Sequence, residues 1–104
     1  MDFLRSVTIV NARITHKKAR VPLIETIAFN DRKGALAEIR SMVDVDECVL
    51  LQTCNRVELY AVGKDGEKIG KVLSEYLVKR AGDMVEEAYK SVEVSFDQDA
   101  LRHI

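Results

Sequence analysis

Val49-Leu50-Leu51-Gln52-Thr53-Cys54-Asn55-Arg56-Val57-Glu58-Leu59-Tyr60-Ala61-Val62 is the stretch around which the rest of the chain is organised. Its two apolar runs, 49–51 and 57–62, are rich in β-branched, aliphatic and aromatic residues, and each is short enough to be a strand. Between them, Asn55 tolerates turn conformations, and its polar neighbours would be costly in a buried core. The stretch therefore predicts a β-hairpin with Cys54 at its tip.

Cys54 is the first candidate functional residue. A thiol at a strand end beside the guanidinium of Arg56 is a plausible nucleophile, because a nearby positive charge favours the thiolate and loops on rigid scaffolds often carry chemistry. The alternative is a buried structural cysteine, which behaves as a small, inert hydrophobe. Spacing alone leaves both interpretations open.

The segments before the hairpin predict one strand and two helical pieces. The apolar alternation over 4–14 predicts a strand, and its change of phase near Val10 suggests a bulge. Helical turns are expected over 21–29, with Pro22 at an early position. Asn30 or Asp31 is a suitable N-cap for a helix that runs to about Val43.

The segments after the hairpin predict a long helix, a strand and the start of a further helix. Asp65 can cap the long helix, and Gly82 is a natural stop for it, whereas 84–89 is ambiguous. The alternation over 92–96 predicts a short strand with one buried face. Asp97 is the expected N-cap of a last helix, in which Phe96 and Leu101 would form a hydrophobic staple.

This order of elements predicts an α+β fold. The sequence β, α, β, β, α, β, with connections of these lengths, suits a ferredoxin-like split-βαβ sandwich, a four-stranded antiparallel sheet with two helices on one face. The helix from Asp97 is the candidate cover for the other face. That helix has no stop signal before Ile104, so the chain is expected to end inside a helix start and to be a fragment.

Length and composition predict one globular domain over 1–104. The chain has 104 residues, of which 47% are hydrophobic and 32% charged, enough for a single core. No apolar run approaches the roughly 18 residues that cross a bilayer, and no signal-peptide pattern is present, so no membrane partner and a cytoplasmic location are expected.

The cysteines and histidines do not predict a disulfide or a metal site. Cys48 and Cys54 lie six residues apart in one predicted strand, roughly 20 Å apart at about 3.3 Å per residue, too far for a disulfide. Zinc would need further closely spaced ligands, and His16 and His103 are the only histidines.

Charge is distributed unevenly along the chain. The net charge is −1, which argues against strong nucleic-acid binding by electrostatics alone. Residues 1–40 hold eight Lys/Arg against four Asp/Glu, net +4, and 41–104 hold eight against thirteen, net −5. The basic cluster of Lys17, Lys18 and Arg20 could contact a phosphate backbone, although a solvated loop is the simpler interpretation.

Three motifs resemble glutamyl-tRNA reductase, the enzyme that opens tetrapyrrole (porphyrin) synthesis. Leu-Leu-Gln-Thr-Cys-Asn-Arg-Val-Glu-Leu-Tyr-Ala at 50–61 resembles the signature of that family. Ile-Thr-His-Lys-Lys-Ala at 14–19 is similar to its N-terminal strand-to-loop segment, and Asp-Ala-Leu-Arg-His at 99–103 to the start of its next helix. The resemblance implies the N-terminal catalytic domain of that oxidoreductase, which is also of the ferredoxin-like kind.

The resemblance implies a role for each residue of the candidate site. Cys54 would attack the ester between glutamate and the tRNA 3′ ribose to form a thioester. Arg56 would hold the glutamyl carboxylate in a bidentate fork, or else only pair with Glu58. Thr53 and Asn55 would orient the substrate, with Asn55 also serving the turn, and His103 would assist acyl transfer by polarising the ester carbonyl or protonating the leaving ribose oxygen. His16 is assigned no catalytic role.

In the family, NADPH then reduces the thioester to glutamate-1-semialdehyde. The resemblance thus implies glutamyl-tRNA as substrate, a homodimer formed through a C-terminal domain, and the glutamate-1-semialdehyde aminomutase as a further partner. Ile24 stands where many members have Arg, and Gln52 where Ser is common. No spacing among the five glycines forms a Gly-x-Gly-x-x-Gly loop, so the NADPH-binding and dimerisation domains are expected to be absent from this chain.

Two further interpretations compete with the reductase domain. The first is a non-catalytic ferredoxin-like interaction module in which Cys54 is incidental. The second is a stand-alone thiol esterase or redox sensor that uses Cys54.

Overall fold

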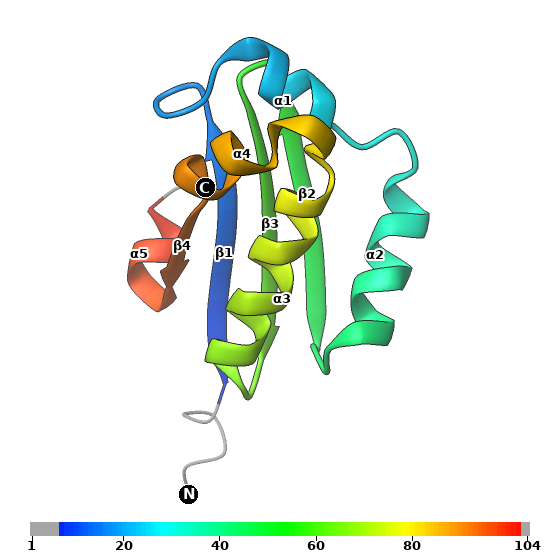
Figure 1. The fold of residues 1–104 in the computed structure, drawn as a ribbon. Coiled ribbons are helices and arrows are strands. Elements are labelled where there is room, and N and C mark those ends of the chain that lie inside the picture. The colour runs from blue at the N-terminus through cyan, green and yellow to red at the C-terminus, as the bar shows by residue number, and fades with distance from the viewer. Residues whose placement is uncertain (1–6, 103–104) are drawn as a thin grey trace, which may run out of the picture.

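The computed structural model describes residues 7–102, in which helices pack against a four-stranded sheet (Figure 1). The strands lie in the order β2-β3-β1-β4, and every neighbouring pair is antiparallel. The predicted α+β class with a four-stranded antiparallel sheet is confirmed. The bounds of the strands are β1 (Thr8–Thr15), β2 (Glu47–Thr53), β3 (Arg56–Gly63) and β4 (Glu93–Phe96).

The predicted hairpin is formed by β2 and β3. Their register runs from Glu47 opposite Val62 to Thr53 opposite Arg56, which leaves Cys54 and Asn55 as the turn. Cys54 therefore lies at the hairpin tip, as the sequence predicts. Because side chains alternate along a strand, Leu50 and Leu59 face the core while Leu51 and Glu58 face the other side of the sheet.

β1 is regular, so the bulge expected near Val10 is wrong. Its pairing with β3 is continuous from Thr8 opposite Gly63 to Thr15 opposite Arg56. The change of phase in the sequence arises because Ile9 is an apolar residue on the face opposite Val10. The start of the predicted strand, at position 4, lies outside the described residues.

The three helices of the two crossovers begin close to where the sequence predicts. They are α1 (Val21–Ile27), with Pro22 in its first turn, α2 (Arg32–Met42) and α3 (Gly66–Lys79). Asp31 caps α2 by accepting a hydrogen bond from the Gly34 backbone N–H at 2.9 Å. Asp65 caps α3 in the same way, accepting from Lys68 at 3.1 Å. The first crossover thus contains the two helical pieces that the sequence predicts, short turns over Val21–Ile27 and a longer helix over Arg32–Met42.

The C-terminal part adds three short pieces. The ambiguous segment 84–89 is helical, since η2 (Gly82–Met84) leads into α4 (Val85–Ser91), and α5 (Asp97–Leu101) follows β4. Phe96, and not Asp97, is the N-cap of α5, and the Asp97 carboxylate instead accepts a hydrogen bond from the Ile9 backbone N–H at 3.2 Å. Phe96 and Leu101 remain 40% and 48% exposed, so the expected staple does not bury either residue fully.

The core lies between the sheet and the helices α2 and α3, which share one face (Figure 1). Tyr76 of α3 donates a hydrogen bond to Glu38 of α2, which ties the two helices together. α5 lies against β1 and β4, so it does not cover the far face of β2, where Val49 and Leu51 are 46% and 40% exposed. On the face that α2 and α3 leave free, the β2 strand of the hairpin is therefore accessible, whereas Glu58 and Tyr60 of β3 are buried.

No helix in the part of the chain that the structure describes is both long and apolar enough to cross a membrane.

Candidate active site

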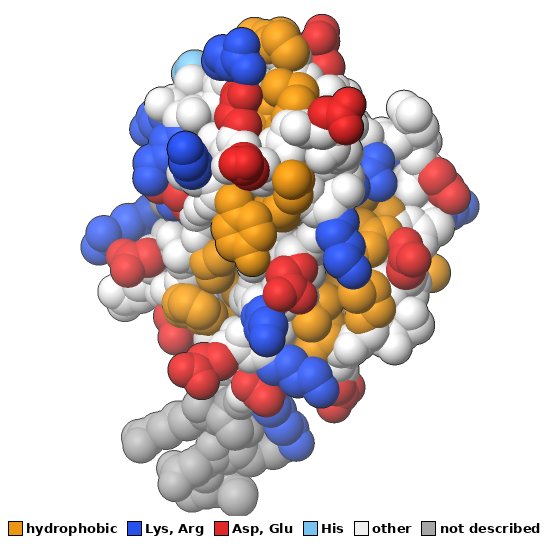
Figure 2. Space-filling model, in the orientation of Figure 1, with side chains coloured by type: hydrophobic (Ala, Val, Ile, Leu, Met, Phe, Trp, Pro, Cys, Tyr) orange, Lys and Arg blue, Asp and Glu red, His pale blue; other side chains and the backbone are white. Residues whose placement is uncertain are grey.

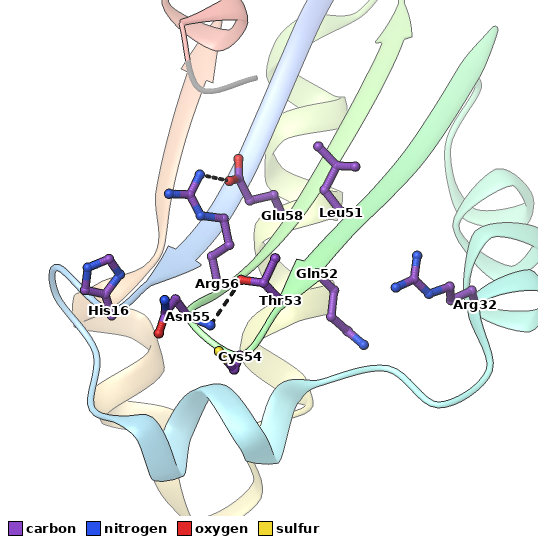
Figure 3. A pocket seen from close by; sticks show the side chains of 9 residues that line it. All are labelled: His16, Arg32, Leu51, Gln52, Thr53, Cys54, Asn55, Arg56 and Glu58. Atoms are coloured by element: carbon purple, nitrogen blue, oxygen red, sulfur yellow. Dashed lines mark hydrogen bonds and ion pairs between the residues drawn. The ribbon is translucent and has the colours of Figure 1, made fainter.

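A pocket of about 570 Å³ opens beside the tip of the β2–β3 hairpin (Figure 3). Its walls come from three places in the sequence: the loop after β1, the first residue of α2, and the hairpin itself. Only the fold brings these segments together. The lining residues are His16, Arg32, Leu51, Gln52, Thr53, Cys54, Asn55, Arg56 and Glu58.

The turn that carries Cys54 is fixed by two hydrogen bonds. Inside the turn, the Asn55 backbone N–H donates to the Thr53 hydroxyl oxygen at 3.1 Å. From outside, the His16 backbone N–H donates to the Asn55 carbonyl at 2.9 Å. The second bond ties the hairpin tip to the loop after β1 and brings the His16 imidazole to the pocket.

Gln52 anchors the hairpin to the segment between α1 and α2. Its amide nitrogen donates to the Phe29 carbonyl at 3.0 Å, and its amide oxygen accepts from the Phe29 backbone N–H at 2.8 Å. Both backbone groups of Phe29 are thereby satisfied by one side chain. This pair holds the start of α2 beside the end of β2, which is why Arg32 reaches the same pocket as Cys54.

Arg56 is held by a buried carboxylate. Its guanidinium donates to Glu58 at 2.9 Å, and the Glu58 side chain is only 1% exposed whereas that of Arg56 is 39% exposed. Glu58 also accepts hydrogen bonds from the Tyr60 hydroxyl at 2.9 Å and from the Asn11 amide at 3.2 Å. One edge of the Arg56 guanidinium is thus fixed by Glu58, while its other N–H donors remain available to a ligand in the pocket.

The network continues across the sheet from Asn11. Arg13 donates to the Asn11 amide oxygen at 2.7 Å and to the Ser95 hydroxyl at 3.0 Å, so the chain of bonds spans β3, β1 and β4. Burial and the hydrogen bond to Glu58 raise the pKa of Tyr60, which keeps its hydroxyl a donor. All buried side-chain nitrogen and oxygen atoms among the described residues have a hydrogen-bond partner. Arg56 is therefore held by a polar layer in which every buried side-chain group has a hydrogen-bond partner. This polar layer consists of Glu58, Tyr60, Asn11, Arg13 and Ser95.

The two cysteines occupy contrasting environments. Cys54 is exposed at the turn, and Cys48, in β2, is 5% exposed within the core. Burial raises the pKa of the Cys48 thiol, so less of it is thiolate near neutral pH. Both thiols are free, as predicted.

This contrast predicts selective labelling. Iodoacetamide at neutral pH should alkylate Cys54 at least about 100-fold faster than Cys48, because Cys48 reacts only after local opening. Peptide mapping by mass spectrometry after timed quenching measures both rates. In concentrated urea the two rates should converge, and equal rates without urea would contradict the burial difference.

The structure brings four of the five predicted site residues into one pocket. Thr53, Cys54, Asn55 and Arg56 all line it, and Arg56 also forms the pair with Glu58 that the sequence suggested as its alternative role. The fifth, His103, lies outside the described residues.

The predicted basic cluster is largely neutralised by carboxylates. Lys18 lies 3.3 Å from Glu93, and Arg20 binds both oxygens of Glu87, at 2.6 and 3.2 Å. On the face that α3 covers, basic and acidic side chains are interspersed (Figure 2). Two of the three basic side chains of the cluster are therefore paired with carboxylates, which weakens their attraction for a phosphate backbone.

The sequence interpretation missed several contributors to the pocket. Arg32 and His16 enter through tertiary contacts that no local pattern shows. Glu58 could have been found, because residues two apart on a strand share a face, which places Arg56, Glu58 and Tyr60 in one row. Among the described residues, no group of three or more His, Cys, Asp or Glu side chains is placed to hold a metal ion.

The fold and the site together define an α+β domain that presents an exposed cysteine on a rigid hairpin, beside an arginine anchored on a buried carboxylate. A family model described as "Glutamyl-tRNAGlu reductase, N-terminal domain" matches residues 12–104. The chain belongs to this family, as the motifs at 14–19, 50–61 and 99–103 indicate.

Individual relatives agree with this membership. The glutamyl-tRNA reductase of Ignicoccus hospitalis is 32% identical over 96 residues, covering 92% of this chain and 21% of that protein. That of Methanothrix thermoacetophila is 43% identical over 61 residues, covering 59% of this chain and 15% of that protein. The solved structure of glutamyl-tRNA reductase from Methanopyrus kandleri matches with a TM-score of 0.61 at 29% identity, covering 91% of this chain and 20% of that one. The chain thus spans about a fifth of the length of these relatives.

Proposed function

We propose that this chain performs the acyl-transfer half of glutamyl-tRNA reduction. The Cys54 sulfur attacks the carbonyl carbon of the ester that joins glutamate to the 3′ ribose of its tRNA. A carbon–sulfur bond forms, the carbon–oxygen bond to the ribose breaks, and the thiol proton is transferred, in the net reaction, to the released ribose hydroxyl. No atom is oxidised or reduced in this step, which leaves glutamate as a thioester on Cys54.

The observation that carries this proposal is the placement of Cys54 and Arg56 around one pocket. The thiol is exposed, and the guanidinium two residues away is oriented by buried Glu58. A planar fork of N–H donors suits a carboxylate, so Arg56 is assigned to the carboxylate of the glutamyl group. This arrangement supports recognition of glutamate and attack on its ester at one site.

Thr53 and Asn55 are assigned to substrate orientation. The Thr53 oxygen already accepts the Asn55 backbone N–H, so its own O–H is free to donate to the ester carbonyl or to the α-amino group. The exposed amide of Asn55 lines the same pocket. His103 keeps its proposed role of polarising the ester carbonyl or protonating the ribose oxygen, on the strength of its motif alone.

Hydride transfer is assigned to NADPH, which is proposed to bind to a part of the enzyme outside the described residues. A dinucleotide site of the common type needs a parallel βαβ unit with a glycine-rich turn, whereas all strand pairs in the described residues are antiparallel and the glycines do not have that spacing. The described residues therefore do not fit the cofactor. Dimerisation and contact with the aminomutase are likewise proposed for other parts of the enzyme.

The strand order supports the finer description of the fold. In a split-βαβ sandwich, the two strands that a helical crossover connects are not neighbours in the sheet. One strand from the other βαβ unit lies between them. The order β2-β3-β1-β4 has this form, with β3 between β1 and β2, and β1 between β3 and β4. On this basis the domain is proposed to be ferredoxin-like.

Intact-mass spectrometry tests the proposed function. The chain is incubated with glutamyl-tRNA at neutral pH without NADPH, alongside Cys54→Ser and the matched control Cys48→Ser. The parent and Cys48→Ser should gain one glutamyl mass that hydroxylamine removes, and Cys54→Ser should gain none that hydroxylamine removes at neutral pH.

Other outcomes separate the competing functions. An unmodified parent protein that releases free glutamate in a Cys54-dependent reaction indicates a thiol esterase. No adduct and no hydrolysis in either this chain or a longer protein that contains it would leave a non-catalytic interaction module.

A further inference from the structure

We infer that Arg32 binds a phosphate of the RNA acceptor strand close to the esterified ribose. This inference rests on the proposed function, because it uses the position of the ester at Cys54. It assigns a substrate contact to a residue that lies outside every motif of the sequence.

Arg32 lines the Cys54 pocket from the far side of β2. Figure 3 shows Arg56 and His16 on one side of the hairpin tip and Arg32, from the start of α2, on the other. The Phe29–Gln52 hydrogen bonds fix the backbone three residues before Arg32 to the end of β2. The position of Arg32 relative to Cys54 is therefore set by the fold, while its side chain stays exposed.

The geometry of the ester then indicates which part of the substrate lies on each side of the hairpin tip. The acyl carbon carries the glutamyl chain and the ribose oxygen, and these substituents leave it in different directions. With the glutamyl carboxylate at Arg56, the ribose points away from Arg56 and toward the Arg32 side. The terminal nucleoside carries its phosphate on that path, and an RNA phosphate is an anion for which a guanidinium is a suitable donor.

The charges of the pocket agree with this assignment. The lining contains two guanidinium groups and a single carboxylate, Glu58, which is already paired with Arg56. The Arg32 side chain has no hydrogen bond or ion pair to any of the described residues. Its place in the first turn of α2, which holds no acidic residue, opposes the helix dipole, so helix stability does not explain it.

Charge reversal tests the assignment, with the neighbouring lysine as matched control. Arg32→Glu and Lys33→Glu change charge equally on adjacent exposed residues, but only Arg32 lines the pocket. Each variant is assayed for thioester formation with glutamyl-tRNA and with 3′-O-glutamyl-adenosine, which has no phosphate. Arg32→Glu should lower the ratio of the two second-order rate constants about tenfold, and Lys33→Glu by less than about twofold.

An RNA-binding measurement tests the inference independently of thioester formation. Fluorescence anisotropy gives the affinity for an uncharged RNA hairpin with a single-stranded 3′ tail, measured against salt concentration. Arg32→Ala should weaken binding several-fold and reduce the slope of log affinity against log salt by about 0.7, as expected for one phosphate contact on a single strand.

The outcomes are distinguishable. If Arg32→Glu and Lys33→Glu behave alike in both assays while the thioester still forms, the inference is overturned and the proposed function stands. If Lys17→Glu lowers the ratio of the two rate constants and Arg32→Glu does not, the RNA strand leaves the pocket on the side of the loop that carries Lys17. The assignment to Arg32 is then wrong. If neither substrate acylates the parent, the proposed function fails, and unchanged RNA binding in Arg32→Ala then rejects the inference as well.

Discussion

Replacing Glu58 with alanine should reduce the free energy of unfolding by about 2–4 kcal/mol, because each buried hydrogen-bond donor that loses its acceptor costs about 1–3 kcal/mol. The loss is large because Glu58 accepts hydrogen bonds from three side chains, those of Arg56, Tyr60 and Asn11, in a position that is 1% exposed. Alanine leaves the Tyr60 hydroxyl and the Asn11 amide without this acceptor. Urea unfolding followed by circular dichroism measures the change.

The Arg20–Glu87 pair provides the matched control for this prediction. It is also a carboxylate bound to a guanidinium, at 2.6 Å, but the Arg20 side chain is 72% exposed. Water replaces the lost partner there, so Glu87→Ala should cost far less stability than Glu58→Ala. Glu58→Gln should fall between the two, because the amide oxygen can still accept from Tyr60. Similar losses for Glu58→Ala and Glu87→Ala would show that the polar layer contributes little.

Replacing Arg56 with alanine should lower the second-order rate constant for thioester formation with glutamyl-tRNA by roughly 10²-fold or more. A charge pair that loses one partner in a binding site typically costs about 2–5 kcal/mol. The preference for glutamyl-tRNA over glutaminyl-tRNA should be lost to the same extent, because the uncharged amide gains little from the guanidinium. Single-turnover rates on the two charged tRNAs give both quantities.

Arg56→Lys separates charge from geometry in this prediction. Lysine keeps the charge but lacks the planar fork that binds a carboxylate with two parallel hydrogen bonds, so its rate and selectivity should be intermediate. Arg56→Ala also leaves the Glu58 carboxylate, which is 1% exposed, without its cationic partner, so it should lose stability as well as activity. Arg56→Lys keeps the charge and should lose less stability, so activities are compared at a temperature where urea unfolding shows each variant to be folded. A selectivity ratio that stays unchanged in Arg56→Ala would place the glutamyl carboxylate elsewhere.

The local pattern of the chain determined its elements and the tip of the hairpin. Alternating apolar residues on either side of Thr53–Arg56 define β2 and β3, and the caps Asp31 and Asp65 set the starts of α2 and α3. These features depend on residues a few positions apart, which is why sequence reasoning finds them. The same locality explains the errors, since the Asp97 carboxylate bonds to Ile9, 88 residues away, and so does not cap α5.

The motif at 50–61 likewise singled out Cys54 and Arg56, the proposed nucleophile and the proposed carboxylate ligand, from the sequence alone. What the tertiary structure decided is what surrounds them. Glu58 becomes buried only when β1 supplies Asn11, and Arg32 reaches the pocket only because Gln52 binds the backbone of Phe29. These contacts join residues 23 and 47 positions apart, and no local propensity encodes such distances. The sequence therefore specifies which groups can react, and the fold specifies how they are held and which further groups face them.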